Sequence, residues 1–458
     1  MLVANEGIDS VILTGGTETA LAMLDNKPDL PLTAETGGKN ATIVTALSDR
    51  DLAIKDVLHS AFSHAGQKCS ATSLLLLEAE VYDSPEFKRM LVEAAQSLKV
   101  GSAWELTTKI GPVIKPPKGD LQEALLTLDG GESWALMPHK IDNNDCLWSP
   151  GIKWDVQPGS TSHMTEFFGP VLSVMRYEKL HDAIAIVNQT GYGLTSGLES
   201  LDDREQQEWK EGIRAGNLYI NRSTVGAIVL RQPFGGLGKS AFGPGIKAGG
   251  PNYVSQFMNF KETADGDQND PANLDKLLAN YEIAWQDEFA TPHDHFKLIG
   301  QDNYRRYLPV RELRIRVHPD DSPRDILARV AAARTAGCRI TISAPPGVQS
   351  QQLERLQDET EHWAGSIEFI EESDEELEAA IKNRAVNRLR YSSAERVPLS
   401  IRRTANQQQI FVADAKVLWE GRLELLWYVV EQSISFDYHR YGNLGGRGDE
   451  PRAPLVSE

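Results

Sequence analysis

Short apolar runs alternate with amphipathic runs between residues 313 and 415, and this alternation most constrains the fold. The order strand, helix, strand requires a crossover between successive strands, so the strands are expected to be parallel within one Rossmann-like sheet. No glycine-rich phosphate loop follows any of these strands, so this part is not expected to bind a nucleotide. The sequence predicts strands at 313–318, 338–345, 366–372 and 409–415 and helices at 322–337, 351–365 and 373–384.

Two of these helices carry clear start signals. Ser322 is placed to cap the first, and Ser373 with Glu376 forms the pattern of a capping box. His318 and Cys338 lie in or beside the predicted strands, so we interpret them as core or edge residues rather than ligands.

The N-terminal sequence contains another strand, turn and helix, in the stretch IDSVILTGGTETALAML at residues 8–24. It predicts a buried strand at 11–14, a glycine turn, and a helix whose first N–H groups can hold a phosphate. The full G-x-G-x-x-G pattern is missing, because Ala20 stands where a closing glycine is expected. An ordinary strand-to-helix turn is therefore an equal alternative.

A cysteine and a glutamate occupy polar, flexible settings further along. Cys69 follows a predicted helix that begins near Asp51 and closes at Gly66, and its neighbours are polar. A thiol in such a loop can act as a nucleophile, although a chance surface cysteine has the same pattern. Glu35 precedes a pair of glycines in AETGGKN, which suits a mobile general base, with a solvated turn as the alternative.

Composition excludes several classes of function. The net charge of −18 over 458 residues argues against nucleic acid or an anionic membrane as the main partner. The three cysteines are far apart, which favours neither a disulfide framework nor a metal site and indicates a reducing compartment, the cytoplasm. No apolar run approaches the roughly 18 residues of a transmembrane segment. The first residues also lack the pattern of a signal peptide.

Four sequence blocks in a fixed order then point to one family. They are ETGGKN at 35–40, GQKCSA at 66–71, EFFGPVLSV at 166–174 and NLYINRSTVGAIVLRQPFGGLGKSAFGPGIKAG at 217–249. Together they resemble the aldehyde dehydrogenase superfamily over roughly residues 1–263. The residues within the blocks are most similar to those of L-glutamate γ-semialdehyde dehydrogenases, also called 1-pyrroline-5-carboxylate dehydrogenases. In particular, they resemble the dehydrogenase half of the bifunctional proline utilisation A flavoproteins.

The resemblance implies a catalytic role for two residues. Cys69 would be the nucleophile that forms a thiohemiacetal and then a thioester with the aldehyde carbon, and Glu35 would activate the water that hydrolyses the thioester. The cofactor implied is NAD, and no metal is expected. One departure is that Gly16 replaces the more usual serine of the cofactor turn. The implied NAD contacts are Thr14, Gly15, Gly16, Glu166 and Phe168.

The resemblance also implies a substrate, L-glutamate γ-semialdehyde, which is oxidised to L-glutamate in the second step of proline degradation. The amino-acid end of this substrate needs hydrogen-bond donors for its carboxylate. Ser70, Gly226 and Ala227 would supply them, and Phe234 would form the side of the aldehyde tunnel.

Members of this family carry a long N-terminal stretch before the residue 14 turn. We therefore expect an α/β aldehyde dehydrogenase fold that lacks most of its N-terminal Rossmann half, followed by a second Rossmann-like domain without catalytic motifs. A non-catalytic structural or oligomerisation fragment is the alternative. The partners implied are a proline dehydrogenase half on the same polypeptide and, at full length, further copies in a homo-oligomer. The expected divisions are a remnant of the NAD-binding domain at 1–37, the catalytic domain at 38–237, an oligomerisation segment at 238–263, a linker at 264–275 and the second domain at 276–458.

Overall fold

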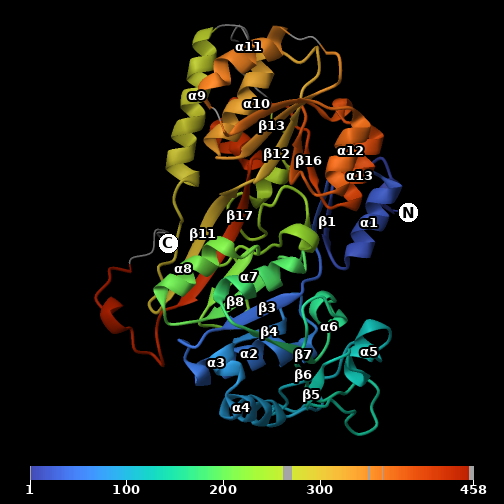
Figure 1. Cartoon of the computed structure of the whole chain (residues 1–458), viewed down its shortest axis with the longest axis vertical. Helices are drawn as coiled ribbons and strands as arrows, with labels where there is room; N and C mark the ends of the chain where they lie inside the picture. Colours follow the sequence, from blue (N-terminus) through green and yellow to red (C-terminus); the bar gives the residue numbers. More distant parts are fainter. Residues whose placement is uncertain (1, 261–270, 349–350, 364, 453–458) are drawn as a thin grey trace. The chain divides into compact units, whose positions relative to one another are not determined.

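A computed structural model describes residues 2–260, 271–348, 351–363 and 365–452 (Figure 1). The chain forms two compact units, each built from separate stretches of sequence. Unit 1 comprises residues 1–35, 241–293 and 305–432, and unit 2 comprises residues 36–240, 294–304 and 433–458. Among the described residues, no helix is long and apolar enough to cross a membrane.

Unit 2 is organised by a sheet whose strand order is β11-β17-β9-β8-β3-β4-β7-β6-β5. The pairs from β17 through β9, β8, β3, β4 and β7 to β6 are parallel, and β5 runs antiparallel to β6. The strands are β3 (Asn40–Val44), β4 (Thr72–Glu78), β5 (Ser133–Leu136), β6 (Gly151–Trp154), β7 (Val171–Tyr177), β8 (Thr195–Glu199) and β9 (Asn217–Ile220), together with the unit 2 parts, at 301–304 and 433–437, of β11 (Gln301–Pro309) and β17 (Val429–Asp437).

The helices of unit 2 cover this sheet because its central strands are apolar on both faces. Every residue of β3 is buried, and so are Leu74 to Leu77 of β4, as expected for parallel strands with helices on both sides. The helices are α2 (Arg50–Phe62), η2 (Ser63–Gly66), α3 (Ala79–Tyr82), α4 (Pro85–Gln96), α5 (Asp120–Leu126), α6 (Thr161–Met164), α7 (Leu180–Gln189), α8 (Asp203–Gly212) and η3 (Gly238–Ser240).

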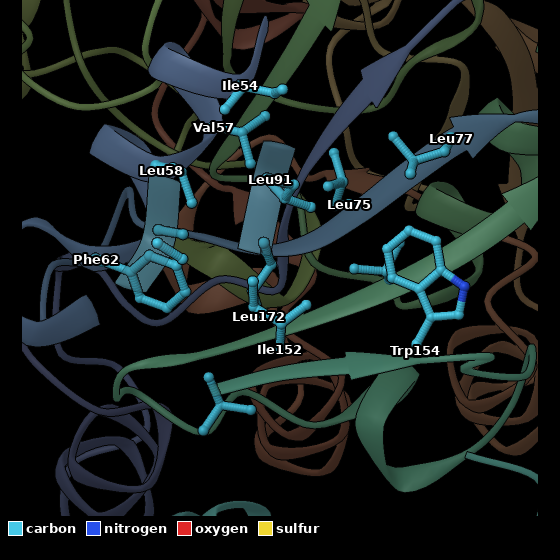
Figure 2. Close-up of a cluster of buried hydrophobic side chains, with 14 of the residues drawn as sticks. Ile54, Val57, Leu58, Phe62, Leu75, Leu77, Leu91, Ile152, Trp154 and Leu172 are labelled. Atoms are coloured by element: carbon cyan, nitrogen blue, oxygen red, sulfur yellow. The ribbon is translucent and has the colours of Figure 1, made fainter. Parts of the chain in front are cut away.

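One apolar cluster fixes the helix that leads to Cys69. The Asp49 side chain caps α2 by accepting a hydrogen bond from the Leu52 amide at 3.2 Å. Figure 2 shows side chains of α2 and α4 gathered against β4, β6 and β7. Because the buried face of α2 continues to its last residue, Phe62, the start of the following turn is held in place. The labelled side chains are Ile54, Val57, Leu58, Phe62, Leu75, Leu77, Leu91, Ile152, Trp154 and Leu172.

Unit 1 contains a small sheet with the order β1-β2-β10. Its elements are β1 (Val11–Thr14), β2 (Leu32–Glu35) and β10 (Ala241–Phe242), with α1 (Thr17–Asn26) after the glycine turn and the short η1 (Leu2–Ala4) before β1. The predicted strand at 11–14 is present, but the prediction that it is buried is wrong. Ile12 is 59% exposed, because β1 lies at an edge of this sheet and pairs with β2 on one side.

The second sheet of unit 1 confirms the alternating pattern read from the sequence. Five parallel strands follow the order β14-β13-β12-β15-β16, with α10 packed on β12 and β13 and α13 packed on β16 (Figure 1). Both helix-start predictions are confirmed, including the capping box of Ser373 and Glu376. The elements are β12 (Glu312–Arg316), α10 (Pro323–Thr335), β13 (Arg339–Ala344), α11 (Gln351–Thr360), η6 (Glu361–Trp363), β14 (Ile367–Glu371), α12 (Asp374–Lys382), β15 (Arg388–Arg390), η7 (Ala394–Arg396), α13 (Leu399–Gln407) and β16 (Phe411–Ala413).

Cys338 is buried in the core beside β13, and His318, just after β12, is partly buried. Residues 264–270 of the predicted linker lie outside the described residues, whereas the prediction is wrong for 271–275, which form the start of helix α9. The segment at 424–437 contributes core residues such as Tyr428 and ends in strand β17, which pairs with β9. The remaining elements are η4 (Tyr253–Phe257), α9 (Pro271–Ala284), η5 (Trp285–Phe289), α14 (Gly421–Glu424), η8 (Leu425–Trp427) and η9 (Gly445–Arg447).

Candidate active site

The turn that carries Cys69 joins η2 to β4 in unit 2, and its backbone is fixed by a buried asparagine. The Asn40 side-chain amide donates to the carbonyl oxygens of Cys69 and Ala71, at 2.7 and 2.9 Å. Its Oδ1 accepts a hydrogen bond from the Thr195 amide at 3.0 Å. Cys69 itself is half-buried. Because Asn40 is itself buried at the start of β3, the backbone of the turn has a rigid support.

The residues just before Cys69 contact the loop at 165–169, which we call the EFF loop. Gly66 has a φ of +67°, and a Cβ there would lie 2.2 Å from the Gly169 carbonyl oxygen, so only glycine fits. Gln67 donates through its side-chain amide to the Phe168 carbonyl at 3.1 Å and accepts from the Ile114 amide at 2.8 Å. Gly66 and Gln67, just before Cys69, are therefore packed and hydrogen-bonded against the EFF loop.

Glu166 of the EFF loop faces the glycine pair at 37 and 38. The Gly38 amide donates to Glu166 Oε1 at 2.9 Å, and a Cβ on Gly37 would lie 1.8 Å from Oε2. Burial raises the pKa of the Glu166 carboxyl, while the Gly38 amide and the charge of Lys39 act in the opposite direction. Phe168 is partly exposed and adopts a φ of +53°, which is uncommon for a bulky residue and marks a constrained loop.

Lys39 lies beneath this loop and was not singled out from the sequence. Its side chain is 2% exposed, and its Nζ lies 4.7 Å from the centroid of the Phe167 ring. Among the described residues, no atom accepts a hydrogen bond from this Nζ. Burial lowers the pKa of Lys39 to about 7, and the nearby charge of Glu166 is the largest effect that opposes this shift.

Ser70, the residue after Cys69, is tied to the loop that carries Gly226 and Ala227. Thr224 donates through its hydroxyl to the Ser70 carbonyl at 2.8 Å and shares a hydrogen bond with the Thr72 hydroxyl at 3.1 Å. Gly226 has a φ of +92°, and both Gly226 and Ala227 are exposed. The structure thus brings Ser70 and this loop together through backbone-directed hydrogen bonds.

Phe234 follows this loop and is half-buried. The buried Asn217 side chain donates to the carbonyl of the neighbouring Gly235 at 3.0 Å, which fixes the backbone beside the ring. Asn217 and Asn40 are thus both buried, and each donates hydrogen bonds from its side-chain amide to backbone carbonyls of a loop.

The remaining predicted residues belong to unit 1. Thr14 and Glu35 are register partners at the ends of the parallel strands β1 and β2, and the Gly15 amide donates to the Glu35 carbonyl at 3.2 Å. Gly15 and Gly16 are exposed, and Gly16 precedes α1, whose first turn carries no side-chain cap. The N–H groups at the start of α1 are therefore available to an anion.

A second buried lysine lies near Glu35 in unit 1. Lys247 is 1% exposed, and its backbone amide donates to Glu431 Oε2 at 2.7 Å. Burial lowers the pKa of Lys247 to about 8, and the charge of Glu35 is the largest effect that opposes this shift, ahead of Glu431. The sequence pattern GPGIKAG gave no signal that this lysine is buried beside a carboxylate.

Comparison with known proteins agrees with the order of the sequence blocks. The chain matches the Aldehyde dehydrogenase family over residues 1–263. It is 36% identical over 277 residues to the bifunctional protein PutA of Escherichia coli. The aligned segment covers 56% of this chain and 20% of that protein. The match therefore spans only a fifth of this longer relative.

Solved structures extend the likeness. Proline utilization A from Corynebacterium freiburgense has a TM-score of 0.80 at 38% identity, covering 96% of this chain and 43% of that one. A 1-pyrroline-5-carboxylate dehydrogenase from Thermus, solved with bound NAD, has a TM-score of 0.50 at 31% identity, covering 57% of this chain and 51% of that one. The first likeness includes the second sheet of unit 1, which lies outside the family match.

Proposed function

Because the chain belongs to the aldehyde dehydrogenase family, we propose that it carries the catalytic cysteine of an NAD-dependent L-glutamate γ-semialdehyde dehydrogenase. The observation that carries this proposal is the Cys69 turn, which Asn40 holds rigidly at the end of a packed helix. The likeness to the E. coli bifunctional protein supports a longer polypeptide in which a proline dehydrogenase part supplies the semialdehyde.

The residues present fit the two ends of NAD. The open N-terminus of α1, after Gly15 and Gly16, suits a phosphate, and Thr14 stands at the end of the preceding strand. Glu166 is a carboxylate with one oxygen held by Gly38, which leaves the other to accept hydrogen bonds from ribose hydroxyls. Phe168 would pack beside the nicotinamide. When bound, NAD accepts the hydride that leaves the reacting carbon.

Cys69 begins the reaction as a nucleophile. Its thiolate attacks the aldehyde carbon, the new carbon–sulfur bond converts the carbonyl to an oxyanion, and the backbone amide of Cys69 can stabilise that charge. Loss of hydride from this thiohemiacetal leaves a thioester on Cys69. A turn whose carbonyls are already bonded to Asn40 does not need to reorganise during these steps.

Glu35 completes the reaction by accepting a proton from water. The hydroxide equivalent adds to the thioester, the carbon–sulfur bond breaks, and L-glutamate leaves with Cys69 restored. The position of Glu35 at the end of β2, half-buried and before two glycines, supports this role. Lys247 is buried nearby, and the charge of Glu35 acts on it to oppose the lowering of its pKa by burial.

The loop beside Ser70 supports the proposed substrate class. Ser70, Gly226 and Ala227 offer a hydroxyl and backbone N–H groups to the carboxylate at the far end of the substrate, and the φ of Gly226 suits close approach of that group. Phe234 would line the side of the aldehyde tunnel. An aldehyde of similar length without a carboxylate should react less well, because the buried hydroxyl of Ser70 would be left without its partner, at a cost of about 1–3 kcal/mol, and the N–H groups of Gly226 and Ala227 would lose theirs.

The test uses acylation, which needs no cofactor. We expect p-nitrophenyl acetate to acylate Cys69 faster than Cys146 or Cys338, and we expect Glu35→Gln to slow release of the acyl group without slowing its formation. Mass spectrometry of the peptides reports which thiol carries acetate. Equal acylation of the three cysteines, or deacylation unchanged in Glu35→Gln, would contradict the proposal.

A further inference from the structure

Lys39 is a buried cation for which the proposed chemistry has no use. It follows the two glycines that face Glu166, and its Nζ lies over the Phe167 ring with no hydrogen-bond acceptor among the described residues. Burying the charge of Lys39 without a hydrogen-bonded partner costs free energy of folding. We therefore ask what the groups around the Lys39 ammonium gain from its charge. The Lys39 ammonium contacts the Phe167 ring, and its charge acts on the carboxyl of the preceding residue, Glu166, so that both effects fall on consecutive residues of the EFF loop.

The neighbouring charges are compensated, in contrast to Lys39. Lys153, which also lies over the Phe167 ring at 5.8 Å, contacts Glu132 at 3.3 Å and donates to Ser162 at 3.0 Å. His163 is bonded through both ring nitrogens, to the Gly159 amide and the Ile186 carbonyl. The charged and titratable groups that act on Lys39 and its partner Glu166 are Glu132, Lys153, His163 and Tyr192.

We propose that Lys39 is a positioning residue that clamps the EFF loop, drawing the Glu166 carboxylate and the Phe167 ring toward β3 so that Glu166 and Phe168 face the nicotinamide end of the cofactor. A cation attracts both groups, because the carboxylate is negative and the ring face carries partial negative charge. The identity of the ligand rests on the proposed function, whereas the clamp itself rests on the contacts of Lys39.

The clamp is expected to weaken with rising pH. The attraction exists only while Lys39 is protonated, and burial brings its pKa to about 7. The loop should therefore be held more tightly in mildly acidic solution than in mildly alkaline solution. Lys153 does not provide this switch, since its ammonium group is directed at Glu132 and Ser162 rather than at Glu166.

Hydrogen exchange of the 458-residue chain tests the proposal. The Gly38 amide, which is bonded to Glu166, and the amides of residues 165–169 are the reporters. In the wild type, their protection factors should fall about tenfold between about pH 6 and pH 9, the change expected from one pKa unit of lost interaction. Lys39→Met should give the low protection at both pH values, and Lys39→Arg, which keeps a cation, should give high protection at both.

Lys88→Met is the control, because the Lys88 ammonium also lies over an aromatic ring, 4.5 Å from the centroid of Trp154, which is not a residue of the EFF loop. It should leave the reporters unchanged. If the protection factors of the wild-type reporters do not change between about pH 6 and pH 9, the proposal is wrong. This test uses the wild type alone, so it applies even if a variant fails to fold. Protection in Lys39→Met that equals the wild type at both pH values also overturns the proposal. Failure of the proposed function would appear separately, as loss of selective Cys69 acylation.

Discussion

Replacing Lys39 by methionine should stabilise the fold at neutral pH and remove part of its pH dependence. The side chain is fully buried, and burial lowers its pKa from the ordinary 10.5 to about 7. This difference corresponds to about 5 kcal/mol of unfavourable free energy for the charged form. Methionine has a similar length and no charge, so Lys39→Met should raise the free energy of unfolding by up to ~5 kcal/mol below pH ~7.

The sign of the pH dependence follows from proton binding. Between pH ~7 and pH ~10.5 the unfolded chain keeps the Lys39 proton while the folded chain has lost it. The unfolded state therefore binds more protons, and the free energy of unfolding rises with pH across this window. The advantage of Lys39→Met should be largest at the acidic end and should vanish near the alkaline end.

Urea unfolding at several pH values measures this difference, with Lys88→Met as the control that should show no such trend. The combination with hydrogen exchange is decisive, because the two readouts should move in opposite directions at mildly acidic pH. Global stability should rise in Lys39→Met while protection of the EFF loop falls. A variant that is less stable than the wild type at all pH values would refute the reasoning.

Three further predictions concern the catalytic turn and the whole chain. Iodoacetamide should label Cys69 before Cys338 in the native protein, because Cys338 is buried and its thiol pKa is raised to about 12; peptide mapping that shows Cys338 labelled first would contradict this. Asn40→Ala should lower the free energy of unfolding by about 1–3 kcal/mol and slow acylation of Cys69, because the turn carbonyls and the Thr195 amide lose their partner. Urea unfolding measures the first effect and acylation rates measure the second. An unchanged acylation rate would show that the Cys69 turn keeps its conformation without Asn40. The 458 residues alone should show no NADH absorbance with glutamate semialdehyde and NAD, because a dinucleotide needs a platform of several parallel strands; turnover would show that β1 and β2 suffice.

The sequence predicted the second sheet of unit 1 well because its signals are local. Alternating apolar runs and the caps at Ser322 and Ser373 act within a few residues, so the strands β12, β13, β14 and β16 and the helices α10, α11 and α12 could each be recognised in isolation, whereas α13 was not predicted. The three-residue strand β15 was not recognised, because its residues, Arg388 to Arg390, are charged at both ends. Arg388 is nevertheless buried and donates to the carbonyls of Trp427 and Pro244, contacts that no local pattern announces.

The candidate site divides in the same way. The order of the motifs indicated functional roles for Cys69, Glu35 and Glu166, because a thiol and two carboxylates are reactive or hydrogen-bonding groups that can be recognised from the sequence. Asn40 and Lys39 were missed, because an asparagine at a strand start and a lysine after glycines are usually solvated. Their burial depends on segments more than 100 residues away in sequence, the EFF loop for Lys39 and Thr195 for Asn40. Only the folded arrangement reveals that these two polar side chains face inward.

The six residues ETGGKN show how much function one short segment can hold. Glu35 ends a strand of unit 1, the glycines leave room for the Glu166 carboxylate, Lys39 lies under Phe167, and Asn40 holds the Cys69 turn. A change of length within this segment would shift these residues relative to one another, since the segment runs from the end of β2 to the start of β3. Substitutions, in contrast, should separate the effects: the residue at 35 acts on acyl release, the residue at 39 on the EFF loop, and the residue at 40 on the nucleophile. The segment is therefore the place where single changes can distinguish the proposed chemical roles from the support that surrounds them.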